Sequence, residues 1–307
     1  NISGIGSHVH GNMKGLSTAG IINVVSGSTK GVEFASLLNM NIGAMRGIQF
    51  AGLSSMSIGP MRGIQLSGGY NVASSEMKGI QVSAIGNITA RGSNILQISG
   101  LFNMGLESMK GIQLAAGNFA DTIKGLQLGI LNVSSSTRKG VQIGLVNYSG
   151  DKSGLQLGLV NLSRSSELDI MMYAGTYLYQ NIAARFQNKY TYSILGLGIP
   201  YHKGGDFSGG VFYRFGVKLP IKRFSLRPDV GIYFLSVFDD DKYKDDPKQE
   251  YSLQGRLSLE YDIAHGIRIF ATGGYSFTSD YGETTYTGKP IFESGLSIFL
   301  TKFSKLK

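Results

Sequence analysis

The sequence predicts an all-β protein with two parts, an N-terminal β-solenoid of about ten short coils and an antiparallel, eight-stranded β-barrel of the outer-membrane type. A Lys/Arg-Gly-Ile/Val-Gln/Glu signature recurs every sixteen residues through the first half. The second half has no repeat, but its apolar and polar residues alternate along extended segments. The 44 glycines and 6 prolines suit strands joined by tight turns. The boundary falls where the repeat ends, so the predicted domains are residues 1–165 and 166–307.

The repeat is anchored on one column of glycines, in which Ile95 replaces glycine once and the spacing later shortens to fourteen or fifteen residues. The anchors are Gly15, Gly31, Gly47, Gly63, Gly79, Ile95, Gly111, Gly125, Gly140 and Gly154. Units this short cannot each bury a core, so they must stack. One coil per repeat, at about 4.8 Å per rung, gives a rod of about 45–50 Å. A membrane-spanning hairpin in each repeat is the alternative, but one spanning strand already takes about 9–11 residues.

Two residues after each anchor, a polar column lies between two apolar ones. Its members are Ser17, Glu33, Gln49, Gln65, Gln81, Gln97, Gln113, Gln127, Gln142 and Gln156. This alternation is that of a β-strand with one wet or hydrogen-bonded face. We expect the apolar columns to face the core of the rod, so that Ile80 points inward and Lys78 outward.

Two further columns help to define each coil. A second extended segment ends on an asparagine column, at Asn23, Asn39, Asn71, Asn87, Asn103, Asn118, Asn132, Asn147 and Asn161. Asparagine is common at turns, and stacked amides can hydrogen-bond from rung to rung. A methionine column precedes the basic residues, at Met13, Met45, Met61, Met77 and Met109. We expect these methionines to fill gaps at the edge of the core, and the alternative is a groove for an apolar ligand or partner.

The last three repeats resemble known proteins. They read GLQLGILN at 125–132, GVQIGLVN at 140–147 and GLQLGLVN at 154–161. These units resemble the tandem surface-repeat proteins of Bacteroidota and Leptospira-type bacteria, in which a Gly-Val/Ile-Gln array is followed by a β-rich C-terminal part. The Gln-x-Gly-x-x-Asn core is also similar to curli-type amyloid repeats, whose Gln and Asn side chains stack rung on rung. The resemblance implies a location in the bacterial envelope.

The second half predicts eight strands, at 167–178, 181–189, 190–199, 209–219, 226–238, 251–264, 267–278 and 291–301. Their polar faces carry full charges, at Arg214, Arg256, Glu260, Asp262, Arg268 and Glu293. Such residues suit the interior of a small transmembrane barrel whose apolar face meets lipid. The alternative is a soluble barrel or sandwich with an apolar core, because it shows the same alternation.

The predicted connections alternate between short and long, as in barrels with tight periplasmic turns and extended outer loops. Those expected to be short are 219–225, 264–266 and the link around 189–190, and those expected to be long are 200–208, 239–250 and 278–290. The link 178–181 is short where a long one is expected. An even number of strands returns the chain to the side on which it entered. We therefore expect both ends of the barrel segment, and with them the solenoid, in the periplasm.

The net charge of +9 is concentrated in the repeat half. Residues 1–165 carry twelve Lys and Arg against five Asp and Glu, or +7, and the remainder carries seventeen against fifteen, or +2. Most cations of the repeats directly precede an anchor, at Lys14, Lys30, Arg46, Arg62, Lys78, Lys110, Lys124 and Lys139. In a solenoid they form a basic stripe suited to an anionic polymer, lipid phosphates or an acidic protein. The alternative is a solvated edge that discourages association.

The sequence contains no strong signal for a catalytic site, a metal site or a cofactor-binding site. There is no cysteine, and the four histidines are His8, His10, His202 and His265. A lone His-x-His pair is weak evidence for a metal site, and the acidic run at 239–246 lacks the spacing of a calcium loop. The basic stripe has no interleaved aromatic residues that would stack on bases, so we expect no nucleic acid partner. We expect no enzymatic activity, metal or cofactor.

These observations favour a non-enzymatic protein that its barrel anchors in the bacterial outer membrane. Outer-membrane lipid is then one partner, and the solenoid is a rigid platform for an envelope protein complex or an anionic polymer. The alternative is a soluble periplasmic or secreted protein, such as an accessory or plug subunit of an outer-membrane translocon. No apolar run is long enough for a membrane-spanning helix. We expect that any export signal preceding Asn1 has been removed.

Overall fold

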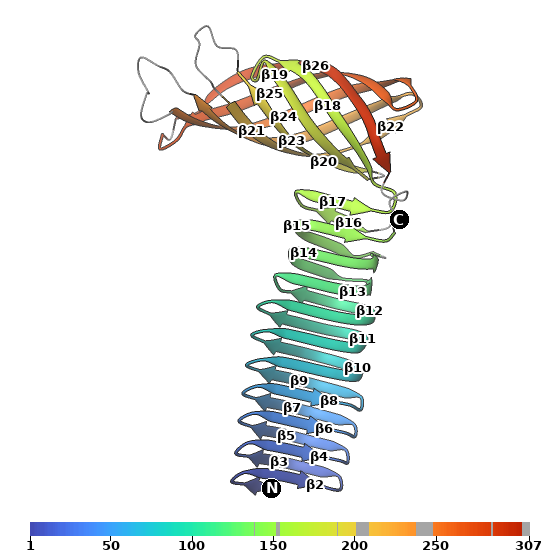
Figure 1. Cartoon of the computed structure of the whole chain (residues 1–307), viewed down its shortest axis with the longest axis vertical. Coiled ribbons are helices and arrows are strands. Elements are labelled where there is room, and N and C mark those ends of the chain that lie inside the picture. The colour runs from blue at the N-terminus through green and yellow to red at the C-terminus, as the bar shows by residue number, and fades with distance from the viewer. Residues whose placement is uncertain are drawn as a thin grey trace. The chain divides into compact units, whose positions relative to one another are not determined.

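The fold is that of a computed structural model. It describes residues 1–137, 139–151, 154–188, 190–200, 209–237, 248–283 and 285–302, without the side chains of residues 92–94, 237 and 248. The chain divides into two compact units, Asn1–Gly158 and Leu159–Lys307. As predicted, the described residues are all-β and form a solenoid of about ten turns and a closed eight-stranded barrel (Figure 1). His202, the rest of the predicted loop at 201–208 and the acidic run at 239–246 lie outside the described residues.

The solenoid contains seventeen strands that belong to one sheet winding through successive coils. In chain order they are β1 (Ile2–Ser3), β2 (Gly6–Val9), β3 (Met13–Ala19), β4 (Ile22–Val25), β5 (Thr29–Ala35), β6 (Leu38–Asn41), β7 (Met45–Ala51), β8 (Ser54–Ser57), β9 (Met61–Ser67), β10 (Tyr70–Ser83), β11 (Gly86–Ser99), β12 (Phe102–Leu114), β13 (Gly117–Ile123), β14 (Leu126–Ser136), β15 (Val141–Ser149), β16 (Leu155–Leu157) and β17 (Val160–Ser163). An early coil consists of one strand of seven residues and one of four, such as β5 and β6. Longer strands such as β10 continue around one edge of the coil.

Successive coils align residue for residue in parallel register, which explains the repeated signature. Gly31 lies beside Gly47. At Gly47 the backbone φ is 143°, and a Cβ atom there would lie 1.8 Å from the Gly31 carbonyl oxygen. Only glycine meets both conditions. Ile95 is accommodated because the β10–β11 register shifts between Met77 and Gly79, and its side chain joins the buried methionine column.

The predicted orientation of the solenoid strands is wrong, because the polar columns face the interior and the apolar columns face outward. Gln49 and Gln113 have no exposed surface, whereas their neighbours Ile48 and Ile112 are 37% and 42% exposed. Ile80 is half-buried and not part of the core. The asparagine column is also buried and lies within strands, not at turns. Most of these buried amides donate to a neighbouring coil, as Gln49 Nε2 does to Glu33 and Asn39 Nδ2 to Phe50 O, so a polar interior leaves few groups unpaired.

Two amide ladders fill this interior and run in opposite directions. The glutamines donate to the preceding coil, for example Gln65 Nε2 to Gln49 Oε1 at 2.8 Å, and the series continues to Gln156. The asparagines donate to the following coil, for example Asn71 Nδ2 to Asn87 Oδ1 at 2.9 Å. Because the side-chain dipoles of one ladder oppose those of the other, they largely cancel along the rod.

The predicted methionine column is confirmed as part of the core. Met45, Met61 and Met77 have no exposed surface, and Met109 has almost none. Together with Ile123 and other small or apolar residues they form one buried cluster. A flexible, unbranched side chain fits the narrow space beside the amide ladders. Because the methionines are covered, this column does not present an open groove.

Eight long strands close the second unit into a barrel. They are β18 (Glu167–Gly175), β19 (Gln180–Gln187), β20 (Thr191–Ile199), β21 (Gly209–Val217) with its continuation β22 (Leu219–Ile221), β23 (Phe224–Val237), β24 (Lys248–Ala264), β25 (Ile267–Asp280) and β26 (Thr287–Lys302). Neighbouring strands are antiparallel, and β18 pairs with β26 to close the barrel. Glu167 lies opposite Lys302, so the first strand begins at the end of the barrel where the last strand finishes.

The connections only partly follow the prediction. The short link between β24 and β25 is confirmed, since it consists of His265 and Gly266. The long loop predicted at 278–290 is wrong, because β25 and β26 extend further and leave only residues 281–286 between them. The ladder continues through polar residues as far as the pair Thr278 and Thr287. The alternation of apolar and polar residues therefore indicates only the apolar part of β25 and β26 and does not predict where these strands end.

Candidate functional site

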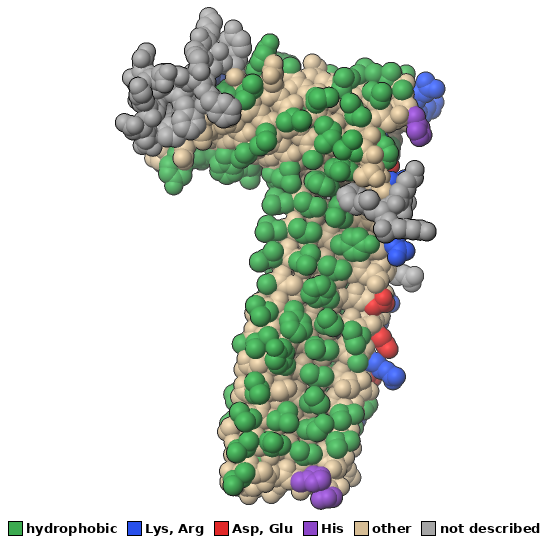
Figure 2. All heavy atoms as spheres, in the orientation of Figure 1, with side chains coloured by type: hydrophobic (Ala, Val, Ile, Leu, Met, Phe, Trp, Pro, Cys, Tyr) green, Lys and Arg blue, Asp and Glu red, His purple; other side chains and the backbone are tan. Residues whose placement is uncertain are grey.

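The outer surface of the barrel is apolar on every long strand. On β24, Leu253 and Leu257 point outward and are 55% and 49% exposed, whereas Gln254 between them is fully buried. Outward, exposed apolar residues on the eight strands include Met172, Ile182, Leu197, Val211, Val230, Leu257, Phe277 and Phe292. Figure 2 shows hydrophobic side chains spread over the visible face of the barrel. A water-soluble barrel has the opposite arrangement, with apolar residues inside.

Inside the barrel, one ion-pair network is centred on Arg185 of β19. Its guanidinium lies 2.7 Å from an oxygen of Asp169 and 2.6 Å from one of Glu260, and it donates to Ser297 Oγ at 2.8 Å. Glu260 also accepts a hydrogen bond from Arg227 Nη2 at 2.7 Å. All four charged residues are buried. A charge tolerates burial only when it is paired and hydrogen-bonded, and these charges are.

A second network is centred on Arg214 of β21. Its Nε and Nη2 atoms donate to the two carboxylate oxygens of Asp229 at 2.9 and 2.7 Å, and its Nη1 atom reaches Glu293 Oε2 at 3.1 Å. Glu293 also pairs with Arg256 at 3.1 Å, and the Tyr192 hydroxyl donates to Asp229 at 3.0 Å. Since β21 and β26 are not neighbours in the sheet, this network joins separate walls of the barrel.

An aromatic cluster fills the interior beside the second network. The rings of Phe212 and Tyr233 stack with centroids 4.8 Å apart, and Tyr173 meets Phe212 edge-on at 6.2 Å. The Arg256 guanidinium lies over the Tyr233 ring, 4.4 Å from its centroid. An eight-stranded barrel is narrow enough to be filled by its own side chains. The two networks and the aromatic cluster fill it in this way.

The charged interior was predicted only in part. Arg214, Arg256, Glu260 and Glu293 are buried in the interior, as expected. Asp262 is not, because its side chain is 56% exposed and bonds Arg268, itself only partly buried, at 3.1 Å near the end of β24. Four further buried charges were not predicted: Asp169, Arg185, Arg227 and Asp229. Each has apolar neighbours along its strand, so the alternation that indicates an inward position was present.

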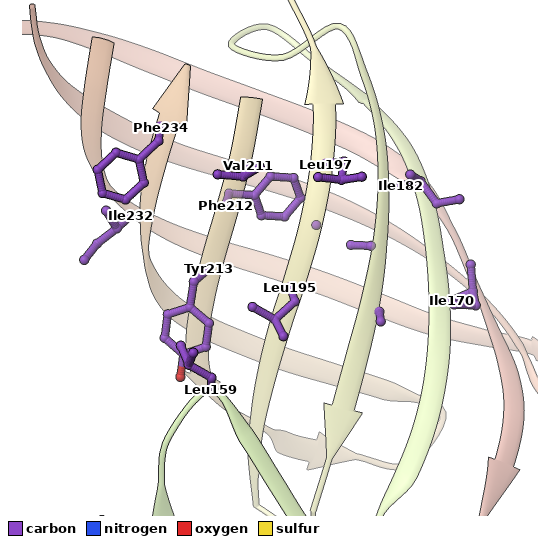
Figure 3. A pocket seen from close by; sticks show the side chains of 13 residues that line it. Leu159, Ile170, Ile182, Leu195, Leu197, Val211, Phe212, Tyr213, Ile232 and Phe234 are labelled. Atoms are coloured by element: carbon purple, nitrogen blue, oxygen red, sulfur yellow. The ribbon is translucent and has the colours of Figure 1, made fainter. Parts of the chain in front are cut away.

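The outer face also carries an open, apolar hollow of about 680 Å³ (Figure 3). Ile182, Leu197, Val211 and Phe234 stand around it on four strands, β19, β20, β21 and β23. Small residues form its floor; a Cβ atom on Gly196 would lie 2.1 Å from the buried Phe212 ring. A depression of this kind on an outward apolar face suits a hydrocarbon chain.

The predicted basic stripe lies along one edge of the solenoid, where each coil passes into the next. Five cations occupy equivalent positions of successive coils, in parallel register: Lys14, Lys30, Arg46, Arg62 and Lys78. Adjacent coils are about 4.8 Å apart. Asn94 replaces a cation in the next coil, and Lys110, Lys124 and Lys139 are exposed farther along the same edge. We call these residues the basic edge.

The first four coils of the basic edge are uniformly positive. Residues 1–75 contain one acidic residue, Glu33, and it is fully buried. Farther along, Lys78 pairs with Glu76 at 2.8 Å, and Arg91 lies 3.8 Å from Glu107. The positive field outside the rod is therefore strongest along the first four coils.

The histidines within the described ranges do not come together with other ligands in a metal site. The rings of His8 and His10 lie 3.9 Å apart, and His8 Nε2 bonds Ser26 Oγ at 2.8 Å. Within the described ranges, no group of three or more His, Cys, Asp or Glu residues is arranged to hold a metal ion. That part of the chain also lacks a helix long and apolar enough to cross a membrane.

Comparison with known proteins adds no relative to these observations. No protein-family model matches the chain, and no curated protein or solved structure matches it significantly. Function is therefore inferred from three features: the apolar barrel surface, the ion-paired barrel interior and the basic edge.

Proposed function

We propose that this chain is a non-enzymatic structural and binding protein of the bacterial outer membrane, with the barrel as its lipid-embedded anchor. The observation that carries the proposal is the inverted polarity of the barrel strands. On β24, Leu257 is 49% exposed while Glu260 is 2% exposed. Such an arrangement is stable when the outer face meets hydrocarbon, because lipid then takes the place of a protein core.

The size of the apolar surface supports lipid over water as its surroundings. Removing apolar surface from water stabilises a protein by about 25 cal/mol per Å². Monomeric soluble proteins rarely expose contiguous apolar patches beyond a few hundred Å², whereas here every long strand contributes. The strands contain eight to seventeen residues, which brackets the roughly 9–11 residues of a tilted spanning strand.

The interior favours an anchor over a channel. Arg185 and Arg214 each join carboxylates from different strands inside the barrel, and the ring of Tyr233 packs against the Arg256 guanidinium. A water-filled pore needs a wider barrel, of about sixteen strands in porins. The barrel therefore holds the protein in the membrane, and the basic edge of the solenoid is the surface offered to partners.

We further propose that the solenoid lies on the periplasmic side. Glu167 and Lys302 are opposite each other at one end of the barrel, and in outer-membrane barrels the short turns face the periplasm. The short link at His265 and Gly266 joins the strand ends at this same end. Only residues 164–166 separate β17 from β18. The resemblance of the repeats to bacterial surface-repeat proteins supports an envelope location.

Membrane fractionation tests the anchor. Membranes from cells that produce the chain are washed with high salt and then with urea, and the barrel should remain in the pellet. A Leu257→Arg variant places a charge on the outer face and should insert less well, since such a charge costs about 2–4 kcal/mol at the bilayer midplane. Release of the folded wild-type chain by salt or urea would contradict the anchor. It would favour the soluble accessory or translocon-plug alternative.

A further inference from the structure

We propose that the solenoid is itself a lipid-binding unit that lies within one leaflet of a membrane, with its basic edge at the phosphate headgroups and its other sides among acyl chains. This proposal rests on the proposed membrane anchorage and adds a second lipid contact to it. It follows from four features of the solenoid: where its apolar residues lie, where its charges lie, how wide it is, and how its polar groups are paired.

Apolar side chains are exposed on three of the four sides of the coil. On one flat face, Ile48 and Phe50 point outward, 37% and 43% exposed. On the other flat face, Ile22 and Tyr70 are exposed to a similar extent. The edge opposite the basic edge carries one column that includes Ile5, Ile21, Leu37, Leu53, Leu101, Ile130 and Leu145, exposed by 42–73%. We call this column the apolar edge.

Charged side chains are confined to the fourth side. Through residues 1–137, 139–151 and 154–158, the charged residues other than buried Glu33 lie where one coil passes into the next, at or beside the basic edge. Figure 2 shows this separation, with hydrophobic side chains over the visible flat face and Lys, Arg, Asp and Glu along one border. Cations beside an anionic lipid surface are attracted to its phosphates.

The width of the coil matches one leaflet. From Lys30 to Ala35 the strand β5 advances five residues, or about 17 Å at roughly 3.3 Å per residue. Half of a bilayer's hydrocarbon core is about 15 Å thick. With Lys30 at the headgroups, the apolar edge reaches the middle of the bilayer.

The solenoid also meets the requirement that polar groups in lipid be paired internally. At the apolar edge, Leu37 N donates to Ile21 O at 3.0 Å and Leu53 N donates to Leu37 O at 3.1 Å, so the backbone is paired from coil to coil. Inside the coil, asparagines of one ladder also donate to backbone carbonyls of the glutamine column, as when Asn71 Nδ2 donates to Gln65 O at 3.3 Å. The backbone at the apolar edge and the amides of the interior are therefore paired within the solenoid.

Lipid explains this surface better than a second copy of the chain. Two flat sheets that pack face to face cover one face of each partner. A dimer would therefore leave the other flat face and the apolar edge in water. Acyl chains cover all three apolar sides at once, and lipid phosphates complement the cations on the fourth.

The absence of tryptophan from the chain permits a direct depth measurement. The full-length protein is reconstituted in vesicles of neutral and anionic phospholipids whose acyl chains carry bromine either near the headgroup or near the bilayer centre. Single tryptophans are introduced by Leu53→Trp and, independently, Leu37→Trp at the apolar edge. Ala44→Trp, an exposed position at the basic edge, is the matched control, and Leu257→Trp reports the barrel.

We expect the fluorescence of Leu53→Trp and Leu37→Trp to be quenched most by the deep bromines, and that of Ala44→Trp only by the shallow ones. Quenching of Leu257→Trp without quenching at either apolar-edge position would overturn the leaflet placement and leave the proposed anchor intact. No quenching at any position would count against both. Cross-linking of Leu53→Cys to a second copy, with Leu53→Trp unquenched, would show that another chain covers this surface.

Discussion

Arg214 Nη1 on β21 donates to Glu293 Oε2 on β26 at 3.1 Å, across the interior of a barrel whose outer face is apolar. The two strands are not neighbours in the sheet, so the bond joins separate walls. Both side chains are buried, and Glu293 also forms an ion pair with Arg256. A barrel that holds its charges inside and its leucines outside is suited to lipid and unsuited to water.

Removal of Glu293 should destabilise the barrel. Glu293→Ala leaves Arg214 and Arg256 buried without this shared carboxylate, and loss of one partner of a buried pair costs about 3–5 kcal/mol. Urea unfolding of the protein in vesicles, followed by the gel mobility of folded and unfolded forms, measures the change. Glu283→Ala, at an exposed site between β25 and β26, is the control and should change stability by less than about 0.5 kcal/mol. Equal effects would mean that the interior network is not formed.

The amide ladder should matter more than the apolar column beside it. Gln113→Leu removes the acceptor of Gln127 Nε2 and the donor to Gln97 Oε1. Each buried group left without a partner costs about 1–3 kcal/mol. Ile112→Gln changes the adjacent, outward side chain and should cost less. If thermal unfolding showed Ile112→Gln to be the more damaging variant, the orientation of the strands would be the reverse of the one described.

Replacement of Glu33, which ends the glutamine ladder, by glutamine should destabilise the solenoid. Its carboxylate accepts hydrogen bonds from Thr29, Asn41 and Gln49. Glu33→Gln replaces one acceptor oxygen with a donor, so at least one of these bonds is lost, at about 1–3 kcal/mol. Gln65→Glu, in the middle of the ladder, buries a charge against Gln49 Oε1 and should cost more. Denaturant titration of the two variants compares them, and a stabilised Glu33→Gln protein would rule out the acceptor role.

The glycine anchors should be irreplaceable where coils touch. Gly47→Ala places a Cβ atom 1.8 Å from the Gly31 carbonyl oxygen at a φ of 143°, and we expect a loss of at least about 3 kcal/mol. Gly255→Ala on β24 has open space around its Cβ position and should fold normally. The yield of folded protein and its unfolding temperature give the comparison. A normally stable Gly47→Ala protein would exclude the close stacking of the coils.

The basic edge should control binding to anions. Replacement of Lys14, Lys30, Arg46 and Arg62 by Gln removes the cations of its uniformly positive part. Retention on immobilised lipopolysaccharide or heparin should fall to background, while the unfolding transition stays unchanged. For the wild-type chain, retention should weaken steeply with salt, because the Debye length shrinks to about 8 Å at physiological ionic strength. If the wild-type protein were not retained on either column at low salt, the basic edge would not bind anions and would be only a solvated border.

The stacking of the coils was predictable, because the repeat places equivalent residues one coil apart. Gly31 and Gly47, and likewise Gln49 and Gln65, are partners in the register that the spacing implies. The eight barrel strands were predictable for a similar reason, since alternation over long segments marks strands. Their ends were not, because residues beyond the apolar belt, such as Thr287, pair without an apolar signal.

The face that each strand buries could not be predicted from alternation alone. Ile112 and Gln113 alternate in the same way whether the core is apolar or polar, and the usual preference for apolar cores led to the wrong orientation in the solenoid. What decides the orientation is whether the amides can pair with one another. The in-register spacing of the glutamines and asparagines carried that information, because identical amides one coil apart form ladders.

A tryptophan on the outer face of the barrel tests the central claim most directly. Leu257→Trp lies near the middle of β24, and Tyr281→Trp lies in the exposed link beyond β25. In vesicles of phospholipid brominated near the bilayer centre, the fluorescence of Leu257→Trp should be strongly quenched and shifted to the blue. That of Tyr281→Trp should be unaffected. Unquenched, solvent-exposed fluorescence from a folded Leu257→Trp protein would contradict a lipid-embedded barrel.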